Sequence, residues 1–130
     1  MPSIFTKIIN REIPAYIVAE DEKHIAFLDI NPLAIGHTLV VPKLEVDYIY
    51  DLSNDALTAL HLFSKKVAIA IKKSVECNRI GITVIGLEVP HAHIHLIPIN
   101  NINDMNFSKP KLSPTKEQMI IVSNQISSNL

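Results

Sequence analysis

Three histidines, His91, His93 and His95, alternate with apolar residues in this chain, and no other feature constrains its fold and chemistry as much. Alternate side chains of a β-strand share one face and lie ~6.6 Å apart along it. We therefore predict a strand over His91–Ile97, with the histidines on one face and the intervening apolar residues packed on the core. One histidine is commonly a hydrogen-bonded residue of the core, whereas three on one face indicate a functional site.

The spacing leaves two chemistries open for these histidines. A His-x-His pair on a strand can hold zinc, and His37 or Asp29 could complete such a site. Histidine also has an unperturbed pKa near neutrality, so a row of histidines can supply a nucleophile, an acid and an orienting group without metal. Spacing by itself does not decide between them.

Composition and charge narrow the class of protein. The chain has 130 residues, of which 48% are hydrophobic and 19% charged, which predicts a single domain over residues 1–130. No apolar run approaches the ~20 residues of a membrane-spanning helix and the first residues do not resemble a secretion signal, so we expect a cytoplasmic protein with no membrane partner. The one cysteine, Cys77, excludes an internal disulfide, and a net charge of −1 disfavours a nucleic-acid partner.

The order of apolar and turn-forming residues predicts an α+β fold. Five strands are expected, over Tyr16–Glu20, His24–Ile30, His37–Val41, Arg79–Gly86 and His91–Ile97. The expected helices are a short one over Ile4–Asn10, a long one from Ser53 or Asn54 to about Cys77, and a C-terminal one opened by Ser113-Pro114. The polar segment Asn100–Leu112 is predicted to be a surface loop. We predict a mainly antiparallel sheet with the long helix packed against it.

The long helix also predicts a homodimer. Leu62, Phe63 and Ile69 lie beside its main apolar stripe and would leave an exposed patch in a monomer. The strand beginning at Arg79 could pair with its symmetry mate, which would remove two exposed sheet edges. We expect the helix and this strand to form the dimer interface.

Four ordered blocks of the sequence resemble the histidine-triad (HIT) family, and its Hint branch in particular. The blocks are Ile4–Ile9 with Glu12–Ala15, Ala26–Pro32, Gly36–Lys43, and the histidine triplet with the apolar residues after it, together covering about residues 3–98. The resemblance implies a HIT-like fold and a phosphoramidase-like hydrolase or transferase, with purine nucleotides of the AMP or GMP type as substrates. It implies reaction at a phosphorus that carries an amine, phosphate or sulfate leaving group, and no cofactor.

The resemblance also implies a role for each matching residue. His93 would be the nucleophile, forming a nucleotidyl-histidine that water then hydrolyses. His95 would contact the phosphate or the leaving group, and His91 and His37 would orient the other two histidines. Asp29 would accept hydrogen bonds from the ribose hydroxyls. The apolar walls around the base would be Phe5, Ile8, Ile13, Phe27, Ile30 and Leu39, and such walls choose poorly between adenine and guanine.

The link before the histidines departs from the family pattern. Hint-type members carry a longer glycine-rich loop whose side chains donate to phosphate, whereas this chain has only Ile85–Pro90. Glu88, followed by Val89, stands where a phosphate-contacting serine is expected, and an anion there opposes an anionic substrate. Glu45 replaces a further expected histidine. A nucleotide-binding or scaffold protein with little turnover and a histidine metal-binding protein therefore remain alternatives. We expect a metal-independent enzyme, because no cysteine or clustered carboxylate is expected beside the histidines.

Overall fold

A five-stranded antiparallel sheet forms the centre of the computed structural model, which describes residues 2–130. Its strands are β1 (Ile17–Glu20), β2 (His24–Leu28), β3 (Thr38–Pro42), β4 (Arg79–Thr83) and β5 (Ile94–Ile99). They lie in the order β1-β2-β3-β5-β4, and every neighbouring pair is antiparallel, so β1 and β4 are the edges. The predicted α+β class and five-stranded sheet are confirmed.

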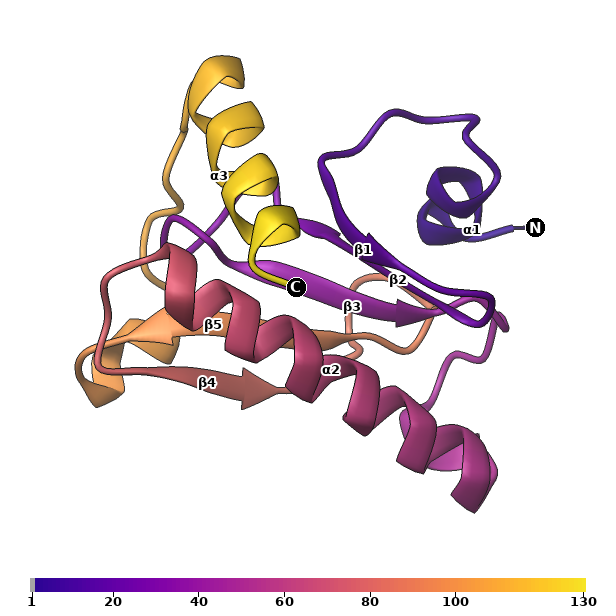
Figure 1. Ribbon diagram of the computed structural model, residues 1–130. Helices are drawn as coiled ribbons and strands as arrows, with labels where there is room; N and C mark the ends of the chain where they lie inside the picture. Colours follow the sequence, from indigo (N-terminus) through magenta and orange to yellow (C-terminus); the bar gives the residue numbers. More distant parts are fainter. Residues whose placement is uncertain (1) are drawn as a thin grey trace.

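Three α-helices surround the sheet: α1 (Ile4–Ile9), α2 (Asn54–Ser74) and α3 (Lys116–Ser128). In Figure 1, α2 and α3 lie together in front of the sheet, and α1 stands apart near β1 and β2. Each helix starts at a hydroxyl side chain that accepts a backbone N–H of the first turn: Ser3, Ser53 and Thr115. Two 3-10 turns, η1 (Ile49–Asp51) and η2 (Ile102–Met105), complete the elements.

The alternation of side chains along the strands divides the core between the two faces of the sheet. Ala26, Leu28, Val40, Ile94 and Leu96 belong to the cluster that contains the buried residues of α2 and α3. The residues between them on β2 and β3 pack with Phe5 and Ile8 of α1 on the other face: Ile25, Phe27, Leu39 and Val41. His95 alternates with Ile94 and Leu96 on β5, so its side chain lies on the face that carries α1.

Two strands differ from their predicted bounds by three residues at one end, and all other strand ends agree with the prediction within two residues. β5 begins at Ile94, so the prediction of a strand from His91 is wrong; the N–H of Ala92 donates to the Val46 carbonyl at 2.7 Å, outside the ladder of the sheet. β4 ends at Thr83 and does not reach Gly86, which has a φ of +73° that no strand residue adopts. The link between β4 and β5 is therefore longer than predicted.

Two helix ends also differ from the prediction. α2 ends at Ser74 because Val75 is already extended, with φ −124° and ψ 129°. α3 begins at Lys116, and Pro114 precedes the helix cap instead of opening the helix. Thr115 and Gln118 form a reciprocal capping box that satisfies two backbone N–H groups, which fixes the start of α3 there.

The outer surface of α2 is partly apolar, as predicted. Leu62 and Ile69 are 64% and 47% exposed. Phe63, which was expected in the same patch, is buried and stacks on His24 with ring centroids 5.0 Å apart. Across residues 2–130, none of the helices combines the length and the hydropathy that crossing a bilayer requires.

Candidate active site

A cavity of about 450 Å³ opens on the face of the sheet that carries α1. Its apolar lining includes all the predicted base-contacting residues and Val89: Phe5, Ile8, Ile13, Phe27, Ile30 and Leu39. Its charged and titratable lining consists of Asp29, Glu88, His93, His95 and Lys111. An apolar cavity of this size with a few converging polar groups is typical of a small-molecule site. The other two predicted residues, His37 and His91, lie behind its wall and are buried.

The connection between β2 and β3 brings Asp29 and His37 together. Asp29 follows the last residue of β2, His37 precedes β3, and the Asp29 N–H donates to the His37 carbonyl at 3.0 Å. Gly36 permits this turn with a φ of +97°. A Cβ at Gly36 would also lie 2.9 Å from a Val75 methyl, so a larger residue would displace α2 or the histidine after it.

His93 is held in one tautomer by the backbone. Its Nδ1 lies 2.8 Å from the carbonyl oxygen of His91, and because a carbonyl only accepts, Nδ1 carries the proton. The other ring nitrogen, Nε2, then keeps its lone pair when the ring is neutral. Burial lowers the pKa of His93, and this effect is larger than the opposite effects of the His91 carbonyl and Glu88. The lowered pKa favours the neutral ring near pH 7. The phenyl ring of Phe5 packs edge-on at 4.9 Å between centroids.

His37 and His95 form a buried pair, and their hydrogen bonds determine which ring nitrogen of each carries the proton. The N–H of Leu33 donates to Nδ1 of His37 at 3.0 Å, so the proton of the neutral ring lies on Nε2. That Nε2–H donates to Nδ1 of His95 at 3.0 Å, which leaves the His95 proton on its own Nε2. Burial lowers the pKa of His37 to about 3 and that of His95 to about 4, so both rings are neutral at pH 7.

His91 is tied to the first turn of α1. Its Nε2–H donates to the Pro42 carbonyl at 2.8 Å, so its Nδ1 accepts from the Ser3 hydroxyl at 2.7 Å. The Glu45 carboxylate accepts the Ser3 N–H at 2.7 Å and the Thr6 hydroxyl at 2.6 Å. This network joins α1 to the residue whose carbonyl holds His93. The sequence marked Glu45 only as a departure, and its contact with α1 was not predicted.

Comparisons with known proteins show the family of this chain. Residues 10–102 match the family model of the HIT domain. This chain belongs to the HIT family. An uncharacterized HIT-like protein of Borreliella burgdorferi is 37% identical over 98% of this chain and 97% of that one. The crystal structure of a HIT-like protein from Bartonella henselae superposes with a TM-score of 0.84 at 31% identity, over 98% of this chain and 96% of that chain. Adenosine 5'-monophosphoramidase HNT1 of Saccharomyces cerevisiae is 38% identical over 73% of this chain and 61% of its own.

Charges of both signs face this HIT site. Burial raises the pKa of Asp29. The hydrogen bond from the Asn31 N–H and the charge of Lys111 lower it, but their effect is smaller than that of burial. The carboxylate of Glu88 adds to the rise at Asp29 and also opposes the fall of the pKa of His93. Glu88 lines the cavity, and its charge therefore acts on both Asp29 and His93.

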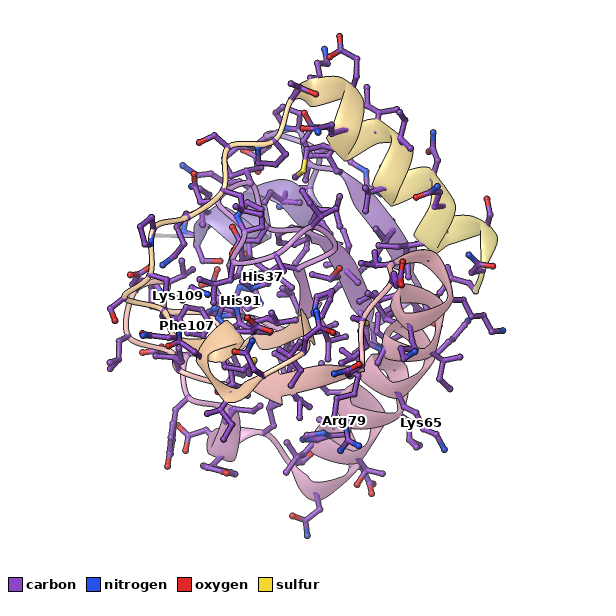
Figure 2. The ribbon with its side chains drawn as sticks, turned by 90° about the vertical axis from the view of Figure 1, so that its left-hand side faces the viewer. His37, Lys65, Arg79, His91, Phe107 and Lys109 are labelled. Carbon is purple, nitrogen blue, oxygen red and sulfur yellow. The ribbon has the colours of Figure 1, made fainter. Side chains whose placement is uncertain are left out.

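Two residues of this site, Phe107 and Lys111, were not predicted. They belong to the segment Asn100–Leu112, which was expected to be only a surface loop and which contains η2. The ring of Phe107 packs edge-on against His95 at 4.9 Å and against His37 at 6.1 Å. In Figure 2, His37 and Phe107 lie near each other, whereas Lys65 lies away from them on α2. Phe107 is the sole aromatic residue of a polar segment, which was the one signal available.

The structure also brings a carboxylate to the histidines. Ligand atoms of Asp29, His37 and His95 all lie within 4.8 Å of one another, and Asp29 Oδ2 is 3.6 Å from His37 Nε2. The premise that no carboxylate clusters with the histidines is therefore wrong. Two imidazoles and a carboxylate are ligands that zinc accepts, so this HIT site also has a donor set that a divalent metal could use.

Proposed function

We propose that this HIT protein hydrolyses or transfers purine nucleotides at the α-phosphorus, through a nucleotidyl-histidine on His93. The observation that carries the proposal is the His93 ring, which lines the cavity while its Nδ1 donates to the His91 carbonyl at 2.8 Å. A neutral imidazole held in this way offers Nε2 as a nucleophile that also leaves readily. The name of the yeast relative, adenosine 5'-monophosphoramidase, supports the same reaction class.

The reaction would proceed in two displacements. In the first, the Nε2 lone pair of His93 attacks phosphorus, and the bond to the leaving amine breaks with its electron pair; the amine takes a proton from solvent. In the second, water attacks phosphorus and releases a proton to solvent, the bond to Nε2 breaks, and the electron pair returns to His93 as the nucleoside monophosphate leaves. The Nε2–H of His95, fixed by His37, would donate to a phosphate oxygen or to the leaving group in both steps.

Nucleotide binding would use the other end of the cavity. Oδ1 of Asp29 accepts the Asn31 N–H at 2.9 Å, which leaves Oδ2 to accept the ribose hydroxyls. The lining beside Asp29 is mainly apolar and would enclose the base with few polar groups, among them Asn31, so it would distinguish poorly between adenine and guanine. We therefore propose AMP-type and GMP-type substrates alike.

Turnover of adenosine and guanosine phosphoramidates tests this function. Wild type and a control variant, His61→Ala on the exposed side of α2, should release the nucleoside monophosphate, and His93→Ala should not. The assay is repeated with chelator, and unchanged rates would support the proposed metal-independent reaction. Turnover by His93→Ala at the wild-type rate would place the nucleophile elsewhere. Binding of purine monophosphates without any wild-type turnover would instead indicate a nucleotide-binding scaffold.

Metal binding is the second candidate function, favoured by the cluster of Asp29, His37 and His95. Metal analysis of protein purified without a histidine tag decides between the two. One equivalent of zinc that is lost in His37→Gln, together with turnover that chelator abolishes and zinc restores, would support a metalloenzyme. Metal-free protein with full turnover would exclude that alternative.

We also propose that the active form is a homodimer joined along α2 and β4. β4 is an edge strand of the sheet, and Ile82 on it is 52% exposed. Leu62 and Ile69 add exposed apolar area on α2, and pairing two copies would cover these residues together with the unpaired edge. Solution scattering at micromolar concentration should give the mass of two chains, and an Ile82→Lys variant should give that of one. A monomeric wild type would refute the dimer.

A further inference from the structure

Residues 106–112 form one wall of the nucleotide site. The segment leaves η2 through a turn in which the Asn106 side chain accepts the Ser108 N–H at 3.0 Å. It returns to the body of the protein where the Leu112 N–H donates to the Pro32 carbonyl at 2.9 Å. Between these two points, Phe107 packs against the rings of His37 and His95. The backbone is thus fixed at both ends next to the proposed reaction centre.

This wall places a cation at the cavity. Lys111 lines the cavity together with Asp29, His93 and His95. Its ammonium group donates to the carbonyl oxygens of Phe107 and Lys109, the latter at 3.2 Å, and lies 5.8 Å from the centroid of the Phe107 ring. Two carbonyls and an aromatic face hold a lysine in one place without neutralising its charge. Burial has the largest effect on both neighbouring groups: it raises the pKa of Asp29 and lowers that of His37. The charge of Lys111 lowers both pKa values, so it opposes burial at Asp29 and adds to it at His37.

The site has a use for such a cation. Glu88 lines the same cavity, and the part of the link that carries it, Val84–Pro90, contains no Ser, Asn or Gln side chain that could donate to phosphate. Among residues 2–130, no ion pair within 4.0 Å includes Glu88 or Lys111, so neither charge is neutralised by a direct partner. The neutral rings of His93 and His95 can donate or accept hydrogen bonds but bring no positive charge. Among the residues that the structure describes, Lys111 is then the one cation lining this cavity.

We propose that Lys111 binds the phosphate oxygens of the nucleotide and supplies a phosphate contact that the side chains of Val84–Pro90 do not. The lysine would exchange one carbonyl partner for a phosphate oxygen, with its other partners keeping the ammonium in place. This inference rests on the proposed nucleotide site but not on the proposed reaction, because binding of a nucleoside monophosphate alone is enough to test it.

The test compares the affinities of adenosine and AMP by titration calorimetry. The two ligands share base and ribose, so the ratio of their dissociation constants isolates the phosphate. Lys111→Met should weaken AMP binding about tenfold while adenosine binding stays unchanged, because one charge-assisted hydrogen bond is lost. The loss should shrink at high salt, and Lys111→Arg should restore most of the AMP affinity.

Lys109→Met is the matched control, since Lys109 belongs to the same segment but its ammonium lies 3.8 Å from Asp104 and does not line the cavity. It should leave both affinities unchanged. A ratio of AMP to adenosine dissociation constants that is unaltered in Lys111→Met, or that Lys109→Met raises equally, would overturn the inference. A wild type that binds neither ligand would overturn both the inference and the nucleotide site. A wild type that binds AMP through Lys111 but turns over no phosphoramidate would support the inference and overturn only the reaction. Unfolding temperatures of all variants confirm that each is folded.

Discussion

The Nε2–H of His37 donates to Nδ1 of His95 across 3.0 Å, and both rings are buried. This one bond decides which nitrogen of His95 carries a proton toward the cavity. Without it, His95 can adopt either tautomer, and in one of them it presents a lone pair to an anionic phosphate. His37 lies outside the cavity, and through this bond it fixes the tautomer of His95, which lines the cavity.

Replacing His37 should accordingly impair the reaction more than binding. His37→Leu removes the donor and leaves Nδ1 of His95 without a partner, so we expect kcat to fall by about 10- to 100-fold, as for loss of a buried hydrogen bond of ~1.4–3 kcal/mol. AMP affinity should change little, because Asp29 and the apolar walls remain. Steady-state kinetics and AMP titration of the same preparation measure both. An equal loss in kcat and in AMP affinity would show a structural role only.

Asp29→Ala should show the opposite pattern. Its carboxylate lines the cavity, and removing it takes away the acceptor proposed for the ribose hydroxyls. Hydrogen bonds to a charged group contribute about 1.5–3 kcal/mol, so KM and the dissociation constant of AMP should rise by about 10- to 150-fold with kcat nearly kept. The 2',3'-dideoxy analogue of AMP provides the control, since it should bind wild type and variant equally. A variant that still prefers AMP over the analogue would refute the role.

The stability of the fold should decrease as the solution is acidified below pH 6.5. Folded His37 and His95 have pKa values of about 3 and about 4, whereas unfolded histidine titrates near 6.5. Between these values the unfolded chain binds more protons, so acid favours unfolding by up to about 1.4 kcal/mol per pH unit for each ring. Asp29 opposes the trend in part, because burial raises its pKa and its protonation favours the folded state.

Urea unfolding at pH 7 and at pH 5 measures this loss of stability. The double variant His37→Gln/His95→Gln should have a shallower pH dependence, and His61→Gln on the exposed side of α2 should match wild type. Equal unfolding free energies of wild type at the two pH values would contradict the neutral state of the buried pair.

The sequence predicted those residue pairs of the site whose two members lie close together in the chain. Asp29 and His37 flank one turn, and His93 and His95 occupy alternate positions. The relative placement of each pair can therefore be inferred from a short stretch of sequence. Lys111 could not be predicted in the same way. Its position depends on the contact of Leu112 with Pro32, which joins segments far apart in the chain and leaves no periodic pattern in either.

The strand bounds at the histidines show a second limit of sequence reasoning. Alternation alone predicted a strand from His91, yet the chain enters the ladder only at Ile94, because the N–H of Ala92 is bonded to Val46. His91 is buried and faces Ser3 instead of the cavity, which explains why it supports His93 and does not line the site. Periodicity selected the three histidines but could not predict which of them line the cavity and which lie behind its wall.

Glu45 should stabilise α1 and, through it, the position of His91. Its carboxylate accepts from the Ser3 N–H and from the Thr6 hydroxyl, and these bonds lower the pKa of Glu45. Glu45→Ala should reduce the unfolding temperature and increase amide exchange in residues 3–9, whereas Glu45→Gln should keep part of the effect. Glu117, an exposed acid in the first turn of α3, gives the control Glu117→Ala. Unchanged exchange in α1 would show that Glu45 does not hold this helix.

The last prediction concerns Glu88, which lines the same cavity as His93 and Lys111. Two unit charges of the same sign at ~4 Å repel by ~4 kcal/mol at an effective dielectric constant near 20, before salt screening and side-chain rotation reduce the value. If about a quarter of this repulsion acts on a bound phosphate, Glu88→Ser should raise kcat/KM on nucleoside phosphoramidates about fivefold, with a larger gain at low salt.

The pH profile separates this effect from a change in packing. Burial lowers the pKa of His93, and the charge of Glu88 partly opposes this effect. The fall of kcat/KM at acid pH should therefore be centred below pH 6.5 in wild type. It should move to still lower pH in Glu88→Ser and in the isosteric Glu88→Gln, because both variants remove the charge. Glu76→Gln, an exposed acid after α2, should change neither the rate nor the pH of this fall. A loss of activity in both Glu88 variants on every substrate, independent of salt, would show that this carboxylate assists catalysis. A loss confined to substrates with basic leaving groups would show that Glu88 binds the departing amine.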